Sequence, residues 1–110
     1  SEAARLAIKG YQLLGKPQKA HDFFNRIISD GYKPIIQDLE SLIFALLMYS
    51  RLNLAVELFE SIQKFGLTAR TSTYNLFIDF HLRESQLEKA RESYQLLLSN
   101  GLRPNQGSYL

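Results

Sequence analysis

The feature that most constrains the fold of this chain is an internal repeat with a period of 35 residues, which runs without insertion or deletion. A repeat of this length is one supersecondary unit that stacks on its neighbours. Tyr109 is in register with Tyr74, which indicates a fourth copy. The recurring residues are Gly31, Gly66 and Gly101, Ala20, Ala55 and Ala90, and Phe24, Phe59 and Tyr94. The register gives three repeats and the start of a fourth: 1–35, 36–70, 71–105 and 106–110.

Each repeat is predicted to fold as a hairpin of two helices. In the second half of repeat 1, Ala20, Phe24 and Ile27 fall on one helical face, and the later repeats keep this pattern. The glycine that follows suits the left-handed position after a helix, and Pro34 prevents the helix from resuming. Short breaks between the helices favour antiparallel pairs. Because one pair cannot bury its apolar faces alone, the prediction is an all-α fold, an α-solenoid of stacked hairpins.

Composition excludes several classes of function. A net charge of +2 permits a nucleic-acid partner without requiring one. The chain has no cysteine, and His21 and His81 have no partner at metal-ligand spacing, so we predict no metal site and no cofactor. No nucleophile or phosphate-loop motif is present, which predicts no catalytic residue and no small-molecule substrate. The longest apolar run, 42–48, is too short to span a bilayer.

The ends of the chain lack the polar capping repeats that a free-standing solenoid needs. We therefore expect a segment of a longer protein. The presence of a catalytic domain elsewhere in that protein is left as an alternative.

The period, the absence of tryptophan and the Gly-x-x-Pro end of repeats 1 and 3 resemble the pentatricopeptide repeat (PPR) family, in its plain 35-residue class. The resemblance covers essentially the whole chain and is best in repeat 3, at Thr73, Tyr74, Asn75, Leu76, Ile78, Asp79 and the run 101–104. It implies a right-handed superhelix whose first helices line a concave groove. It also implies binding of single-stranded RNA, one base per repeat, in mitochondria or alternatively in chloroplasts.

The resemblance further implies which residues recognise the RNA. Two side chains per repeat would contact each base, and the corresponding pairs here are Arg5 with Ile35, Glu40 with Arg70, and Asn75 with Asn105. Only the third pair matches the usual choices of the family, and it implies a pyrimidine. An amide suits this role because it offers both a donor and an acceptor to a base edge. Arg83 lies where the family often has a cation that faces the phosphates.

All three repeats depart from the family pattern just after their first residue. Glu2, Gln37 and Ser72 stand where many members carry a small aliphatic residue that packs against the base. Phe44 and Met48 fall on the groove side of a helix that is apolar nearly all round, which fits either burial or a contact with a protein partner.

Two functions therefore remain. The first is a module that binds single-stranded RNA within an organellar factor for RNA processing, stability or translation. The alternative is a protein-interaction scaffold, such as a component of an organellar ribosome.

Overall fold

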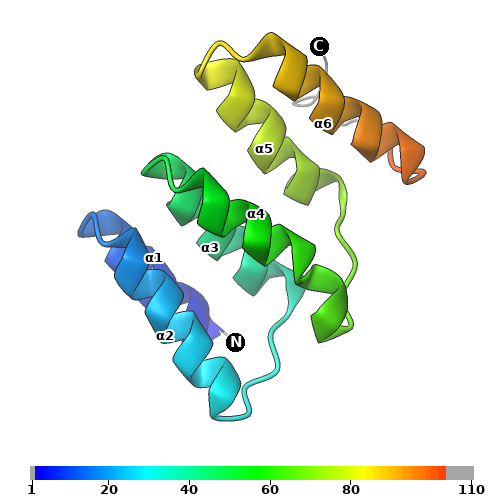
Figure 1. Cartoon of the computed structure of the whole chain (residues 1–110). Coiled ribbons are helices and arrows are strands. Elements are labelled where there is room, and N and C mark those ends of the chain that lie inside the picture. The colour runs from blue at the N-terminus through cyan, green and yellow to red at the C-terminus, as the bar shows by residue number, and fades with distance from the viewer. Residues whose placement is uncertain (1, 104–110) are drawn as a thin grey trace. The chain divides into compact units, whose positions relative to one another are not determined.

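The computed structural model describes residues 2–103, and within that range the chain is entirely helical, without a strand (Figure 1). It divides between residues 68 and 69 into two compact units. Unit 1 contains α1 (Glu2–Leu13), α2 (Pro17–Ser29), α3 (Ile36–Met48), α4 (Leu52–Glu60) and the short 3-10 helix η1 (Ile62–Phe65). Unit 2 contains α5 (Thr71–Arg83) and α6 (Leu87–Ser99). The expected start of a fourth repeat, 106–110, lies outside the described residues.

The predicted all-α class and the helical hairpins are confirmed. The pairs α1–α2, α3–α4 and α5–α6 pack together, and each lies within one of the three predicted repeats. Among the residues that the structure describes, no helix is long and apolar enough to cross a membrane.

In unit 1, α3 is the central helix and packs against α1, α2 and α4. This position explains why its sequence is apolar on nearly every side, since a helix with neighbours around it buries most of its surface. Its buried apolar residues are Leu39, Leu42, Ile43, Ala45, Leu46 and Leu47. Phe44 and Met48 are the exceptions and are about 40% exposed.

The second helices follow the predicted apolar face. Ala20 and Phe24 on α2 are buried, as are Ala55 and Leu58 on α4. The α-helix of repeat 2 ends at Glu60, where the Ser61 hydroxyl donates to the Leu58 carbonyl (2.7 Å), and the chain continues as η1. Phe65 of η1 then packs edge-on against Phe24, with ring centroids 6.0 Å apart. Repeat 2 thus reaches its closing glycine by a tighter path than repeats 1 and 3.

The closing glycines adopt the left-handed conformation that the sequence predicted. Gly31 has φ +99°, and its N–H donates to the Ile28 carbonyl while the Tyr32 N–H donates to Ile27. This is the paired hydrogen bonding that terminates many helices. The turn directs the chain back toward the start of α3, where the polar contacts of unit 1 are concentrated.

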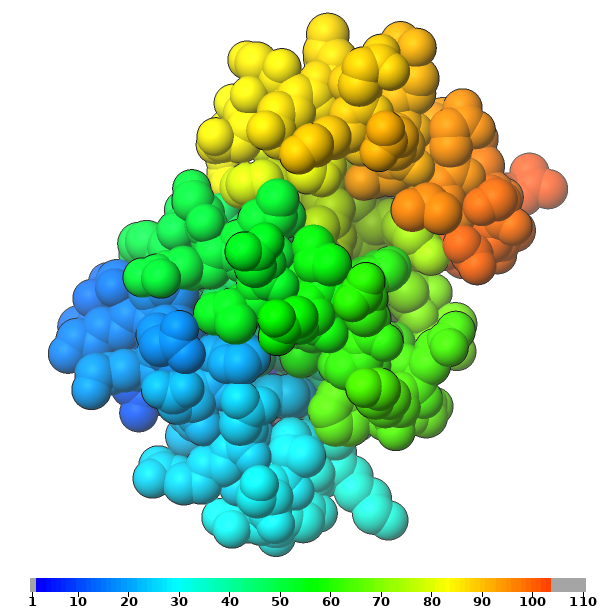
Figure 2. Space-filling view, viewed as in Figure 1, coloured from blue at the N-terminus to red at the C-terminus, as the bar shows by residue number. Residues whose placement is uncertain are grey.

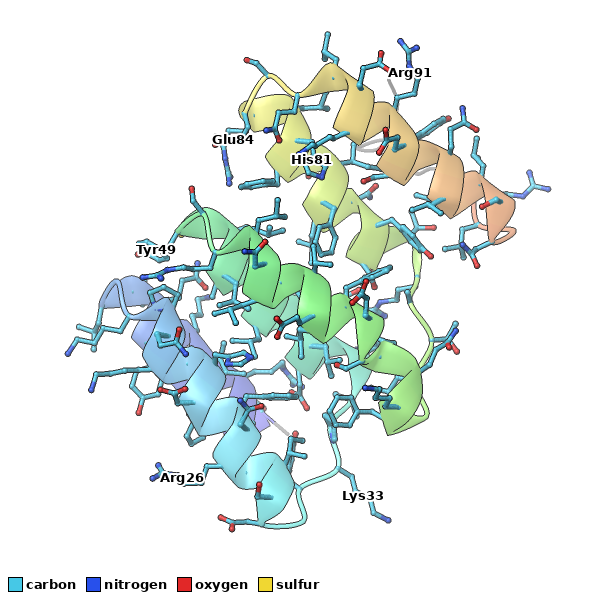
Figure 3. The ribbon with its side chains drawn as sticks, viewed as in Figure 1. Arg26, Lys33, Tyr49, His81, Glu84 and Arg91 are labelled. Atoms are coloured by element: carbon cyan, nitrogen blue, oxygen red, sulfur yellow. The ribbon has the colours of Figure 1, made fainter. Side chains whose placement is uncertain are left out.

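Unit 2 is a single hairpin. Its core is formed by Tyr74, Phe77, Ile78 and Phe80 of α5 with Ala90 and Leu97 of α6. His81 is also buried (Figure 3), and its Nδ1 lies 3.1 Å from Oε1 of Gln86 in the turn that joins the two helices. A hydrogen bond of this kind is the usual way to satisfy a core histidine. No group of acidic, histidine or cysteine side chains suited to a metal ion occurs among the described residues.

Candidate nucleic-acid interface

The first helices of unit 1, α1 and α3, lie side by side. In the view of Figure 1 they lie behind the second helices α2 and α4, so the face shown in Figure 2 is mainly that of the second helices in this unit. The residues that the family resemblance assigns to RNA in unit 1 therefore belong to the opposite layer. Arg26 of α2 and Lys33 of the following turn extend outward from the second-helix side (Figure 3).

The base-recognition pair predicted for repeat 1 meets at a third residue, Asp38. Arg5 on α1 places Nη1 3.5 Å from Oδ1 of Asp38 on α3. The arginine side chain is 33% exposed, whereas the aspartate side chain is fully buried. Ile35 precedes α3 and is exposed, but its backbone N–H donates to Oδ2 of the same aspartate at 3.0 Å. Both members of the pair are thus tied to one carboxylate.

Asp38 has a further partner in the turn between α2 and α3. The Tyr32 hydroxyl donates to its Oδ2 at 2.6 Å, a short distance that is typical of a hydrogen bond to an ionised carboxylate. We name Arg5, Tyr32, Ile35 and Asp38 the Asp38 cluster. It joins α1, the α2–α3 turn and the start of α3, so it links the first hairpin to the second. A buried carboxylate needs such compensation, because moving a charge out of water is costly.

Sequence reasoning did not identify Asp38 as part of the site. The available signal was its place three residues after Ile35, the residue that precedes the helix, where an acidic side chain can turn back to cap a backbone N–H. The contact with Arg5, 33 positions earlier, has no local signature.

The pair predicted for repeat 2 falls in different units. Glu40 is half-buried on α3, and Arg70 is the exposed residue before α5. The Arg70 backbone N–H donates to Oγ1 of the fully buried Thr73 at 3.1 Å. Thr73 thus caps α5 as Asp38 caps α3.

In repeat 3, Asn75 is half-buried on α5, one turn after Thr71. The Thr71 hydroxyl donates to the Arg103 carbonyl at 2.9 Å, so the start of α5 contacts the chain shortly before position 105. Asn105 itself lies outside the described residues.

Arg83 is the last residue of α5 and is exposed. Its guanidinium lies 5.5 Å from the centre of the Phe80 ring, which orients the cation without neutralising it. Desolvation raises the pKa of the nearby Asp79 above its ordinary value, and the charge of Arg83 partly opposes this rise. An exposed arginine held in this way can contact a phosphate.

Phe44 and Met48 are exposed apolar residues on successive turns near the end of α3. Nε2 of Gln12 lies 3.4 Å from the Met48 sulfur, and the Tyr49 hydroxyl donates to the Gln12 carbonyl at 2.7 Å (Figure 3). These contacts bring the end of α1 against the end of α3. The next residues along α1 and its turn, Leu13 and Leu14, are also exposed. We name Leu13, Leu14, Phe44 and Met48 the apolar end of unit 1.

A cavity of about 500 Å³ lies elsewhere in unit 1, between the first turn of α1 and the last turns of α2. Its lining is mainly apolar and includes Ala3, Ala4, Phe23 and Ile27. It contains none of the residues predicted to contact RNA.

Comparison with known families agrees with this architecture. The PPR repeat family matches residues 6–32 and 72–102, which lie in the first and third hairpins and together make up more than half of the chain. The chain therefore belongs to the pentatricopeptide repeat family. PPR repeats are generally RNA-binding helical modules of RNA processing, and PPR proteins are typically non-catalytic. No curated protein matches the chain.

Proposed function

We propose that this chain binds single-stranded RNA and that its third hairpin recognises a pyrimidine through Asn75 together with Asn105. The observation that carries the proposal is the position of Asn75. It lies on the first helix of a hairpin that the family matches, half-buried, near the Thr71–Arg103 hydrogen bond that joins the start of α5 to the segment before Asn105. A partly buried amide at this place has both the donor and the acceptor that a pyrimidine edge requires.

Arg83 supplies the second element of the proposed interface. Its exposed guanidinium at the end of α5 would bind a phosphate, while the amide contacts the base. The protein would act in an organelle, in mitochondria or alternatively in chloroplasts, in the processing, stability or translation of transcripts. Three repeats alone would bind weakly, since stacked bases contribute about 1–3 kcal/mol each before ordering costs.

The test is a fluorescence-anisotropy titration of the full-length protein with labelled oligo-pyrimidine and oligo-purine RNA. We expect saturable binding that weakens with salt and prefers pyrimidines. Asn75→Ala should remove most of that preference and lower pyrimidine affinity about tenfold, the loss expected for one good hydrogen bond of about 1.4 kcal/mol. Asn53→Ala is the matched control, because Asn53 is exposed on the second helix α4. No binding at about 50 μM, or about −6 kcal/mol, would refute RNA recognition as the primary role.

The apolar end of unit 1 favours a second candidate function, a protein-interaction scaffold such as a component of an organellar ribosome. Phe44 and Met48 are exposed on a helix that is otherwise largely buried, and exposed apolar surface often marks a protein contact. Sedimentation of the full-length protein in an organellar extract tests this candidate. Co-migration with ribosomal particles that is lost in a Phe44→Ser, Met48→Ser double variant would support it, and migration as a free protein would contradict it.

A further inference from the structure

We propose that Asp38 is a positioning residue: it retains Arg5 within the protein, so that this arginine is not available to the bound RNA. This inference rests on the proposed RNA-binding function. It concerns a residue that acts through another one, since Asp38 itself is fully buried and cannot reach a ligand.

The first step of the argument is the charge balance at Asp38. Its two oxygens have separate partners: Oδ2 accepts from Tyr32 and from the Ile35 N–H, whereas Oδ1 faces Nη1 of Arg5. The donors to Oδ2 are neutral. Arg5 supplies a full positive charge, and a buried carboxylate that loses its cation is strongly destabilised.

The second step concerns the availability of Arg5. Its side chain is one-third exposed, although the Nη1 atom that faces Asp38 is buried. A contact with a base or phosphate that turned the guanidinium away from Oδ1 would leave the buried carboxylate without its cation. The gain from one solvent-exposed ion pair is small, and the penalty for an uncompensated buried charge is large. The equilibrium therefore favours the contact with Asp38.

The third step is the comparison with α5. Thr73 occupies the equivalent position and caps the backbone in the same way, but a hydroxyl carries no charge with which to retain an arginine. The cap requires only an oxygen acceptor. The retention of a cation is thus a property of the aspartate at position 38.

The test is Asp38→Asn, which preserves the size of the side chain and an oxygen acceptor for Ile35 and Tyr32 but removes the charge that holds Arg5. Binding of labelled oligo-uridylate to the full-length protein is measured across a salt series. Release of Arg5 to a phosphate should steepen the slope of log Kd against log salt by about 0.7, the value for one phosphate contact on a single strand. Affinity at low salt should rise about two- to fivefold.

Two controls separate this effect from a change in net charge. Asp22→Asn adds the same charge on the exposed face of α2 and should leave the salt slope at the wild-type value. Adding Arg5→Ala to Asp38→Asn should return both the slope and the affinity to wild type. A gain that persists in this double variant, or an Asp38→Asn slope equal to that of wild type, would overturn the inference while the proposed function stands. Absence of binding in the wild type itself would overturn both.

A measurement on the wild-type protein covers the case in which Asp38→Asn fails to fold. Side-chain NMR signals of arginine and asparagine are followed while oligo-uridylate is added. The Asn75 amide signals should shift, and the Arg5 guanidinium signal should stay in place because Asp38 retains it. A shift of the Arg5 signal comparable to that of Asn75 would show that Arg5 contacts the RNA and would refute the proposal.

Discussion

The starts of α3 and α5 occupy the same place in two repeats and solve the same backbone problem with different chemistry. The residues just before the two helices are Ile35 and Arg70. In each, the backbone N–H donates a hydrogen bond to the side chain three positions later. Asp38 does so in unit 1 and Thr73 in unit 2, and both are fully buried. The aspartate also contacts Tyr32 and Arg5, which compensate its buried charge. A threonine hydroxyl is neutral and needs no compensation of charge.

This difference shows how a repeat protein can keep its fold while the surroundings of one equivalent position differ between repeats. The backbone requires only an acceptor at this position, so either residue maintains the hairpin. The charge of the acceptor then decides what happens to a neighbouring cation. In unit 1 an arginine of the first helix is bound to the protein, whereas in unit 2 Arg83 at the other end of α5 stays exposed.

The largest expected effect is that of Asp38→Ala. This substitution removes the acceptor of two hydrogen bonds and the counter-charge of Arg5, and should lower the free energy of unfolding by about 2–4 kcal/mol. Urea unfolding followed by circular dichroism measures it. A loss under about 1 kcal/mol would mean that the Asp38 cluster contributes no more than an ordinary cap.

Thr73→Val should have a smaller effect. The substitution conserves shape and removes the hydroxyl that accepts from the Arg70 N–H, which is expected to cost about 1 kcal/mol. The same urea experiment gives the comparison directly. Equal losses for the two variants would break the distinction between a charged cluster and a neutral cap. The exposed Thr68→Val is a suitable control for the chemical change alone.

The smallest expected effect is that of Arg83→Ala on the pKa of Asp79. Desolvation raises the pKa of Asp79, and Arg83 opposes the rise, so Arg83→Ala should raise this pKa further. The pKa of Asp79 in the folded state exceeds its ordinary value of 3.8. Its contribution to stability is therefore fully present below pH 3.8 and is lost as the pH rises through the folded-state pKa. NMR titration of the Asp79 carboxyl in both proteins measures the change. An unchanged or lower pKa in the variant would show that the two charges do not interact.

Much of the fold could be predicted from local pattern. The period, the helical spacing around Ala20 and Phe24, and the left-handed Gly31 depend on interactions within about ten residues, where periodicity and turn chemistry are informative. The replacement of the last turn of the second helix by η1 was not predicted. A 3-10 turn differs from an α-helical turn only in a shift of the backbone hydrogen bonds by one residue, which the spacing of apolar residues does not reveal.

The candidate site was predictable only in part. Register with the family proposed Arg5, Ile35 and Asn75 as candidates, because a repeat of constant length conserves the place of each position. Register could not indicate that Arg5 and Ile35 both contact Asp38, since side-chain partners depend on how α1 packs against α3. It also assigned Phe44 and Met48 to one face, and their exposure depends on how much of α3 its neighbours cover.

The sequence by itself determined the unit of the fold: an uninterrupted period that specifies two helices, their apolar faces and their closing turns. Those features arise from near neighbours along the chain, and so they are visible in the order of residues. Tertiary structure alone decided the partners of the charged groups. Arg5 and Asp38 are far apart in sequence and meet because packing of the first helices brings them together at a buried position, where a charge must be compensated.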